Sequence, residues 1–468
     1  MYRYSNGQIS LSDFKQPVGM NLKENNRWVK KAQTIPWLDI EKRYAKLFTN
    51  RKGNVAKPLR LALGACIIQA EYGFSDEETG LQIQENPYLQ YFCGYAGYDD
   101  EHLPFDPSLM VYFRKRLTPE VLGEINEMIL KTATKTDDND KHDPPAGGRN
   151  RGTLIVDATC APSEIRFPQD VSLLDEAREN AEQIVDALQE QSVEKKPRTY
   201  RNKAHRDSLK YMRSRKHTEK KTREAIRKQL QYLRRDLSVI NSMLQSGLKL
   251  SSKQELRLET LRKIYEQQKY MYDNHTHSVP DRIVSVSQPF IRPIVRGKAG
   301  KPVEFGAKLD ISVSDGWTRL ERWSFDAYNE ATKLIETIER YREREGHYPE
   351  RVLADKIYRN RENLGYCKLH GIRLSGPALG RPKKDEQRDR RQTYLDQNER
   401  IEVERQFSLA KRKCNLGKVK TKLEETVGFT LAMSIVVLNL RKLQRTLSRL
   451  LSQILRYLWP QQKLAFVQ

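Results

Sequence analysis

The chain has 468 residues and a mass of 54.8 kDa, which is enough for two or three domains with hydrophobic cores of their own. Lys and Arg number 84 and Asp and Glu 61, so the net charge of +23 favours a polyanionic partner such as nucleic acid. The five cysteines are far apart with no C-x-x-C pair, which argues against a zinc site or a disulfide framework and for a reducing compartment.

Residues 1–132 are predicted to form a helical domain. Helix-start signals recur at Pro58, at the capping box that begins with Ser75, and at Pro119. The following segment, within 133–152, is polar and rich in Pro and Gly, which predicts a linker and a domain boundary. The N-terminal residues contain no apolar run typical of a signal peptide, so we expect a cytoplasmic, nucleoid-associated protein.

The stretch "GTLIVDATCAP" predicts a strand that ends at Asp157 and opens the first part of an α/β core, residues 153–168. Residues 169–280 then read as a helical insertion. From Ile226 the apolar residues recur at alternating steps of four and three, the seam of a coiled coil, and a break at Gly247 predicts an antiparallel helical hairpin.

Much of the positive charge lies in that insertion. Residues 195–235 contain seventeen Lys or Arg and three acids. This basic arm is predicted either to follow a DNA backbone or to form the solvated face of a coiled coil that serves as a dimer contact. The sequence leaves both roles open.

The remainder of the core, residues 281–427, starts with the strand signals "FIRPIVRG", "VEFGAKLDISV" and "WTRLERWSF". Helices and the strands "RVLAD" and "GIRLSGPAL" alternate after them, and a long helix is expected through Glu404. The order predicts a mixed sheet of the α+β or α/β class. Residues 428–468 are predicted to be C-terminal helices, and the apolar run Phe429–Leu440 is too short for a membrane span, so we expect a buried helix.

Acidic residues follow two of these apolar strands. Asp157 comes after "TLIV" and Asp355 after "RVLA", and functional groups of α/β sheets gather at the carboxyl ends of strands. Either aspartate alone is also compatible with a turn or a helix cap. On the later helix Arg400, Glu404 and Lys411 fall within a sector of roughly 40°, although a surface ion pair would show the same spacing.

Together these motifs resemble bacterial insertion-sequence transposases with a ribonuclease H-like DDE catalytic core. The stretches "LRLALGACIIQAEYGFSDEETGLQIQENPYLQYFCGY" and "DPSLMVYFRKRL" are similar to their N-terminal helical DNA-binding domain. "LIVDAT", "GKPVEFGAKLDISV", "VLADKIYRNREN" and "RIEVERQFSLAKRK" are similar to their core. Arg400, Glu404 and Lys411 also match the spacing of a subset with a Tyr-Arg-Glu-Lys signature, but Gln397 occupies the tyrosine position and Tyr394 lies about one turn earlier.

The resemblance implies three catalytic, metal-binding carboxylates, Asp157, Asp355 and Glu404, which hold two Mg²⁺ ions, with Mn²⁺ as a substitute. It also implies DNA contacts; the residues expected to make them are Gln397, Arg400, Lys411, Arg412 and Trp317. For Trp317 core packing is an alternative to stacking on a base.

The implied activity is metal-dependent cleavage at transposon ends and transfer of the 3′-OH into target DNA. The expected partners are double-stranded DNA, as terminal inverted repeats and target, and a second copy in a synaptic homodimer, rather than a membrane. A catalytically inactive DNA-binding protein and a stand-alone nuclease of the same fold are the alternatives.

Overall fold

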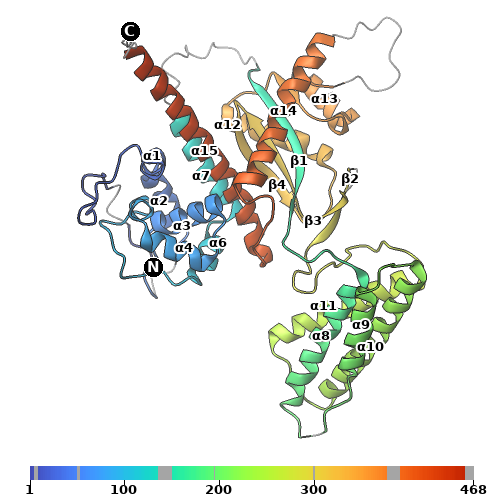
Figure 1. Cartoon of the computed structure of the whole chain (residues 1–468). Coiled ribbons are helices and arrows are strands. Elements are labelled where there is room, and N and C mark those ends of the chain that lie inside the picture. The colour runs from blue at the N-terminus through green and yellow to red at the C-terminus, as the bar shows by residue number, and fades with distance from the viewer. Residues whose placement is uncertain are drawn as a thin grey trace, which may run out of the picture. The chain divides into compact units, whose positions relative to one another are not determined.

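The structure is a computed structural model that describes residues 1–4, 9–49, 53–134, 150–193, 195–298, 301–376 and 390–458. It divides into two compact units (Figure 1): Met1–Ala161 with Lys308–Ser324 and Tyr328–Gln468, and Pro162–Ala307 with Phe325–Ala327. Most of the predicted linker, and the stretch "PALGRPKKDEQRD", lie outside the described residues.

Helices make up the N-terminal part of the first unit: α1 (Arg27–Thr34), α2 (Trp37–Ala45), α3 (Leu59–Tyr72), α4 (Asp76–Glu85), α5 (Pro87–Phe92), α6 (Leu109–Arg116) and α7 (Pro119–Thr134). Three of them begin at the predicted signals. The Ser75 side chain, for example, accepts a hydrogen bond from the Glu78 amide and caps α4. Buried residues line most of α3, so this helix lies in the core of the unit.

The six strands are β1 (Thr153–Pro162), β2 (Arg292–Lys298), β3 (Lys301–Ser314), β4 (Trp317–Ser324), β5 (Arg351–Leu353) and β6 (Arg373–Leu374). They form one sheet in the order β2-β3-β1-β5-β6, and β4 pairs with β3. β2 and β4 run antiparallel to β3, whereas β5 runs parallel to both β1 and β6. The sheet is therefore mixed, as predicted.

Helices follow or separate the later strands: η2 (Glu330–Lys333) and α12 (Leu334–Glu345) before β5, then η3 (Lys356–Tyr358), α13 (Arg361–Leu369), α14 (Arg390–Lys413) and α15 (Glu424–Leu458). One face of the sheet is covered by α12, whose Leu334 and Ile338 pack with Leu154 of β1 and Val352 of β5. These contacts fix the two parallel strands that carry the candidate acids.

Several predicted boundaries were wrong. β1 continues five residues beyond Asp157, because Cys160 and Ala161 are buried and extend the apolar run across the acid. The strand predicted at "GIRLSGPAL" is limited, among the described residues, to Arg373–Leu374. In contrast, α14 continues to Lys413 and contains Arg400, Glu404 and Lys411 as predicted, whereas a single helix α15 occupies residues 424–458 where several were expected.

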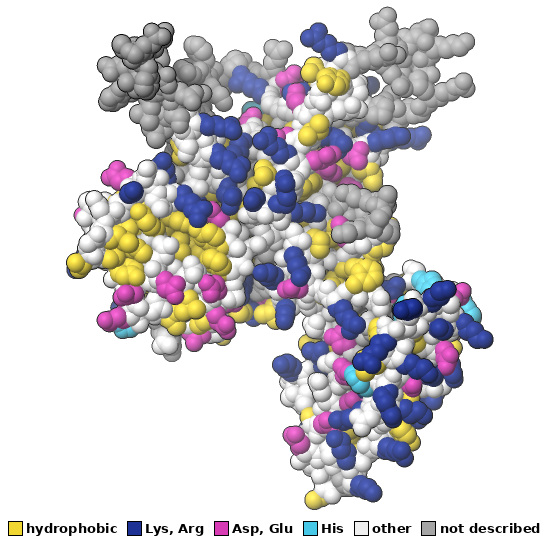
Figure 2. Space-filling view, viewed as in Figure 1, with side chains coloured by type: hydrophobic (Ala, Val, Ile, Leu, Met, Phe, Trp, Pro, Cys, Tyr) yellow, Lys and Arg dark blue, Asp and Glu magenta, His cyan; other side chains and the backbone are white. Residues whose placement is uncertain are grey.

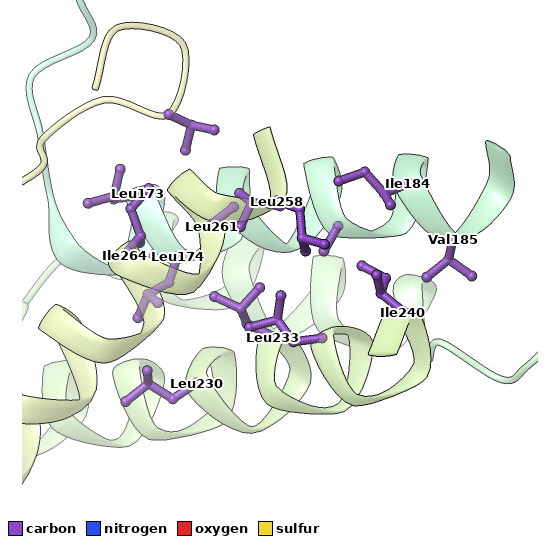
Figure 3. Packing of buried hydrophobic residues seen from close by; sticks show 14 of the residues in the cluster. Leu173, Leu174, Ile184, Val185, Leu230, Leu233, Ile240, Leu258, Leu261 and Ile264 are labelled. Atoms are coloured by element: carbon purple, nitrogen blue, oxygen red, sulfur yellow. The ribbon is translucent and has the colours of Figure 1, made fainter. Parts of the chain in front are cut away.

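Within its described residues the second unit contains four helices, α8 (Asp170–Gln189), α9 (Arg201–Met212), α10 (Glu219–Gln245) and α11 (Ser252–Asp273), between β1 and β2 in the chain. The predicted two-helix hairpin is thus incomplete. Leu233 and Ile240 of α10 pack against Leu174 and Val185 of α8 as well as against α11 (Figure 3). The apolar stripe of α10 therefore belongs to a multi-helix core, in which each fully buried leucine contributes roughly 1.5–3 kcal/mol.

One helical segment within the described residues, Glu424–Arg449 of α15, is long and apolar enough to cross a membrane. However, 83% of its apolar window is buried inside the protein. Its Asn439 side-chain amide is also buried and donates to the Thr318 carbonyl oxygen at 2.7 Å and to Asn126 at 2.8 Å. The segment is a core helix, so the buried-helix prediction for Phe429–Leu440 is confirmed.

Candidate active site

The pairing of β1 with β5 places two predicted acids side by side. The strands are parallel, and Ile155 is the partner of Leu353 in their register. Asp157 and Asp355 each lie two residues further along their strands, and a step of two returns a side chain to the same face of a sheet. Asp157 lies within β1, whereas Asp355 follows β5 and caps η3 by accepting the Lys356 amide at 2.7 Å.

Two ion pairs fix α14 against β5 and β6. The Arg351 guanidinium on β5 lies 2.7 Å from Glu399, and that of Arg373 on β6 lies 2.6 Å from Asp396. The Asp396 side chain is only 8% exposed and that of Arg373 is 42% exposed, so the pair is partly shielded from solvent. This anchoring brings the next turns of α14, with Arg400 and Glu404, to the edge where Asp157 and Asp355 lie.

Arg400 lies between two of the three acids. Its guanidinium is 4.0 Å from an Asp157 carboxylate oxygen and 3.6 Å from a Glu404 oxygen. Both distances exceed a normal hydrogen bond, so neither carboxylate is tightly bound. The Glu404 side chain is 57% exposed and that of Asp157 is 22% exposed, so the acids remain accessible from solvent.

Two of the three acids act electrostatically on the third, Asp157. Burial raises the pKa of Asp157, and the carboxylates of Asp355 and Glu404 raise it further. The Ala158 amide, which donates to Asp157 at 2.8 Å, and the Arg400 guanidinium act in the opposite direction on this pKa. A partly desolvated carboxylate with two acidic neighbours is an arrangement that a divalent cation would stabilise.

The described residues contain one tighter group of possible metal ligands, on α8 and α9 of the second unit. Ligand atoms of Asp175, Glu179 and His205 all lie within 4.8 Å of one another, a spacing that the three acids of the sheet do not reach. However, Asp175 already binds Arg178 at 2.7 Å and accepts the Ser208 hydroxyl at 2.7 Å. Its carboxylate is therefore engaged by protein groups.

The residues predicted to contact DNA are spread along α14 and β4. Gln397 is exposed, as is Tyr394 one turn earlier, whose side chain is 64% exposed. Lys411 and Arg412 lie in the last turn of α14. Trp317 lies at the start of β4 with the Lys442 ammonium 4.4 Å from its ring centroid, so this tryptophan takes part in packing with α15.

Comparison with known proteins identifies two domains. The family model of a transposase DDE domain matches residues 352–441, and that of the transposase domain DUF772 matches residues 18–116. Both matches are to transposase domains, and together they support an insertion-sequence transposase. The chain is also 29% identical over 171 residues to the uncharacterized protein ORF8 in the nfe locus of Rhizobium meliloti. The aligned segment covers 36% of this chain and 77% of that protein. No solved structure matches it.

The DDE domain implies that this transposase acts on DNA and uses a divalent metal ion. The matched range contains Asp355 and Glu404, and the strand of Asp157 lies before it in the chain. The two neighbouring carboxylates that perturb Asp157 therefore belong to the DDE domain.

Sequence reasoning missed a fourth acid of the transposase near this site. Asp310 on β3 is 3% exposed, and one of its carboxylate oxygens has no hydrogen-bond partner among the described residues. Burial raises the pKa of Asp310 to about 6. The buried Tyr358 hydroxyl interacts electrostatically with both Asp310 and Asp157. The only signal in the sequence was an acid inside the apolar run "KLDISV".

Proposed function

We propose that this transposase cleaves phosphodiester bonds at the ends of its element and joins the new 3′-OH to target DNA, with Asp157, Asp355 and Glu404 as the metal ligands. The observation that carries the proposal is that the carboxylates of Asp355, from the turn after β5, and of Glu404, from α14, both act electrostatically on Asp157 of β1. The strand order, with three antiparallel strands beside parallel ones, supports assignment of the core to the ribonuclease H-like class.

The donor set fits hard divalent cations, which prefer carboxylate oxygens. A pair of Mg²⁺ ions at these carboxylates would activate an attacking hydroxyl and neutralise charge on the leaving oxygen in an in-line displacement. In cleavage, water attacks phosphorus and the bond from phosphorus to the 3′ oxygen breaks. In joining, the released 3′-OH attacks a target phosphate and a target 3′ oxygen leaves.

Basic side chains of α14 are proposed to hold the DNA for this reaction. Arg400 is adjacent to two of the acids and can present a planar guanidinium to a phosphate that bridges them. Lys411 and Arg412 lie seven and eight residues further along α14, about two turns beyond Glu404. Gln397, in the position of the signature tyrosine, can donate from its amide but has no phenol, so we expect a weaker phosphate contact there.

The test is a cleavage assay on a plasmid that carries the coding region's flanking DNA on both sides, with Mg²⁺. Asp355→Asn and Glu404→Gln should each lower the cleavage rate by more than about 100-fold, exceeding the loss typical of residues that only orient a metal ligand. Glu343→Gln on α12, an exposed acid with no ion pair among the described residues, is the control with the same charge change. Cleavage that survives Asp355→Asn would remove this residue from the site.

A second assay separates the transposase from a stand-alone nuclease of the same fold. An oligonucleotide duplex that is already cut at the element's end should be joined to plasmid DNA by the wild-type protein. Cleavage without joining would support the nuclease, and neither reaction would support an inactive DNA-binding protein. Joined products that contain two ends in one target would further support a synaptic homodimer.

A further inference from the structure

A basic groove lies between α14 and α15 in the first unit. Its cavity of about 170 Å³ is lined by six cations and one acid, Glu402; the cations are Arg405, Lys413, Arg441, Lys442, Arg445 and Arg449. Figure 2 shows Lys and Arg side chains gathered over the region where these two helices meet.

The groove keeps much of its positive charge. Glu402 lies 3.5 Å from Arg405, and Arg441 lies 3.5 Å from the buried Glu71, which also pairs with Lys31. These distances are long for strong ion pairs, and the Arg405 side chain is still 67% exposed.

The other cations of the groove are less compensated. Lys413, Arg445 and Arg449 are exposed and make no ion pair within the part of the chain that the structure describes. Lys442 is partly buried, donates to the Asp315 carbonyl oxygen at 3.1 Å and interacts electrostatically with the carboxylates of Glu402 and Asp315. Cations held together without matching acids repel one another, so a polyanion would stabilise this arrangement.

The spacing on α15 suits an extended polyanion. Arg441, Arg445 and Arg449 are each four residues apart, so they form a ridge about 12 Å long at a rise of ~1.5 Å per residue. One DNA strand presents a phosphate about every 3.4 Å along the helix axis, so this ridge spans roughly three to four phosphates. A pocket of about 170 Å³ is smaller than the ~300 Å³ at which small-molecule sites begin, which favours a backbone phosphate.

The groove uses the face of α14 opposite the candidate active site. At ~100° per residue, Glu404 lies roughly 40° around the helix from Arg400. Arg405 and Lys413 lie roughly 140° and 220° around the helix from Arg400. A phosphate held by these two cations is therefore not the phosphate beside Glu404.

We propose that the groove between α14 and α15 is a second DNA site, which binds the phosphate backbone of duplex DNA away from the reacting phosphodiester. The inference rests on the proposed function in taking DNA as the polyanion, but not on the identity of the metal ligands. Backbone binding of this kind is independent of base sequence and strongly dependent on salt, because each neutralised phosphate releases counterions.

The test compares Arg445→Gln/Arg449→Gln with Arg361→Gln/Lys368→Gln, two exposed cations of α13 that make no ion pair among the described residues. Both double variants lose the same charge. Binding of the full chain to a fluorescently labelled duplex is measured by anisotropy over a range of NaCl concentrations, in EDTA so that no cleavage occurs. The slope of log K against log salt should fall by about 1–2 units in the groove variant and stay at the wild-type value in the control.

Each outcome decides the matter. Equal slopes in the groove variant and the wild type would overturn the second DNA site and leave the proposed function intact. A wild-type protein that binds no duplex would overturn both. The groove variant could also keep the wild-type salt slope for duplex binding but lose binding to poly-glutamate. That result would assign the groove to an acidic protein partner and would also overturn the proposal.

Discussion

Two groups of possible metal ligands in the part of the chain that the structure describes have different surroundings. On α8 and α9, Asp175, Glu179 and His205 lie close together, and the almost fully buried Arg178 binds both Asp175 and Glu182. At the sheet, Asp157, Asp355 and Glu404 come from three separate elements, and Arg400 approaches two of them only to 4.0 and 3.6 Å.

The comparison shows that proximity of acids alone does not indicate a metal site. In the helical unit the buried Arg178 guanidinium neutralises the charge of the Asp175 and Glu182 carboxylates, as in a structural ion pair. At the sheet, burial and then the neighbouring acids raise the pKa of Asp157, and the acids stay accessible, so their charge is available to a ligand. The looser group is therefore the better candidate for catalysis, and each prediction below tests this difference.

The largest expected effect is on stability in the helical unit. Arg178→Met should destabilise α8 and α10 by about 3–5 kcal/mol, because it leaves the carboxylates of Asp175 and Glu182 without their shared partner. Hydrogen exchange of peptides from these helices in the full chain measures the change. Lys253→Met, at an exposed position of α11, is the control and should leave exchange unaltered. Similar exchange in both variants would mean that Arg178 is not a structural partner.

The corresponding change at the sheet should affect activity instead of stability. Arg400→Gln is expected to lower the cleavage rate by about 10–100-fold, because the guanidinium supports two acids and a substrate phosphate without being buried. Cleavage rates and melting temperatures of this variant are compared with those of Arg361→Gln. A large drop in melting temperature with an unchanged cleavage rate would make Arg400 a structural residue like Arg178.

A smaller effect concerns pH. Burial and then the Glu182 carboxylate raise the pKa of Asp236 on α10 to about 7, well above about 3.9 for an unfolded chain. Between these values the folded state binds a proton that the unfolded state has lost, so this group makes stability fall as pH rises. Asp236→Asn should therefore match the wild type below about pH 4 and be more stable above about pH 7.

Urea unfolding at several pH values measures this gain, with the exposed Glu266→Gln on α11 as control. A stability gain of Asp236→Asn that grows toward acidic pH would contradict the expected direction of the pH dependence. It would also contradict the view that Asp236 is a purely structural carboxylate of the helical unit.

Sequence patterns predicted a large part of the candidate site. Asp355 and Glu404 were found because an acid after a short apolar strand and the spacing from Arg400 are local features. The end of β1 was mispredicted because Asp157 interrupts an apolar run without ending it. The spacing of apolar residues in α10 predicted a buried stripe. It could not show that α8 covers this stripe, because any helix with an apolar face could pack there. The basic groove likewise depends on the packing of α14 on α15, which neither helix reveals alone.

We expect a divalent metal ion to bind at Asp157, Asp355 and Glu404 and not at the tighter group on α8 and α9. Crystals of the wild-type protein grown with Mn²⁺ and measured at the manganese absorption edge locate the ion directly. Anomalous density is expected between Asp157 and Asp355, with further density toward Glu404. Density confined to Asp175, Glu179 and His205 would contradict this expectation.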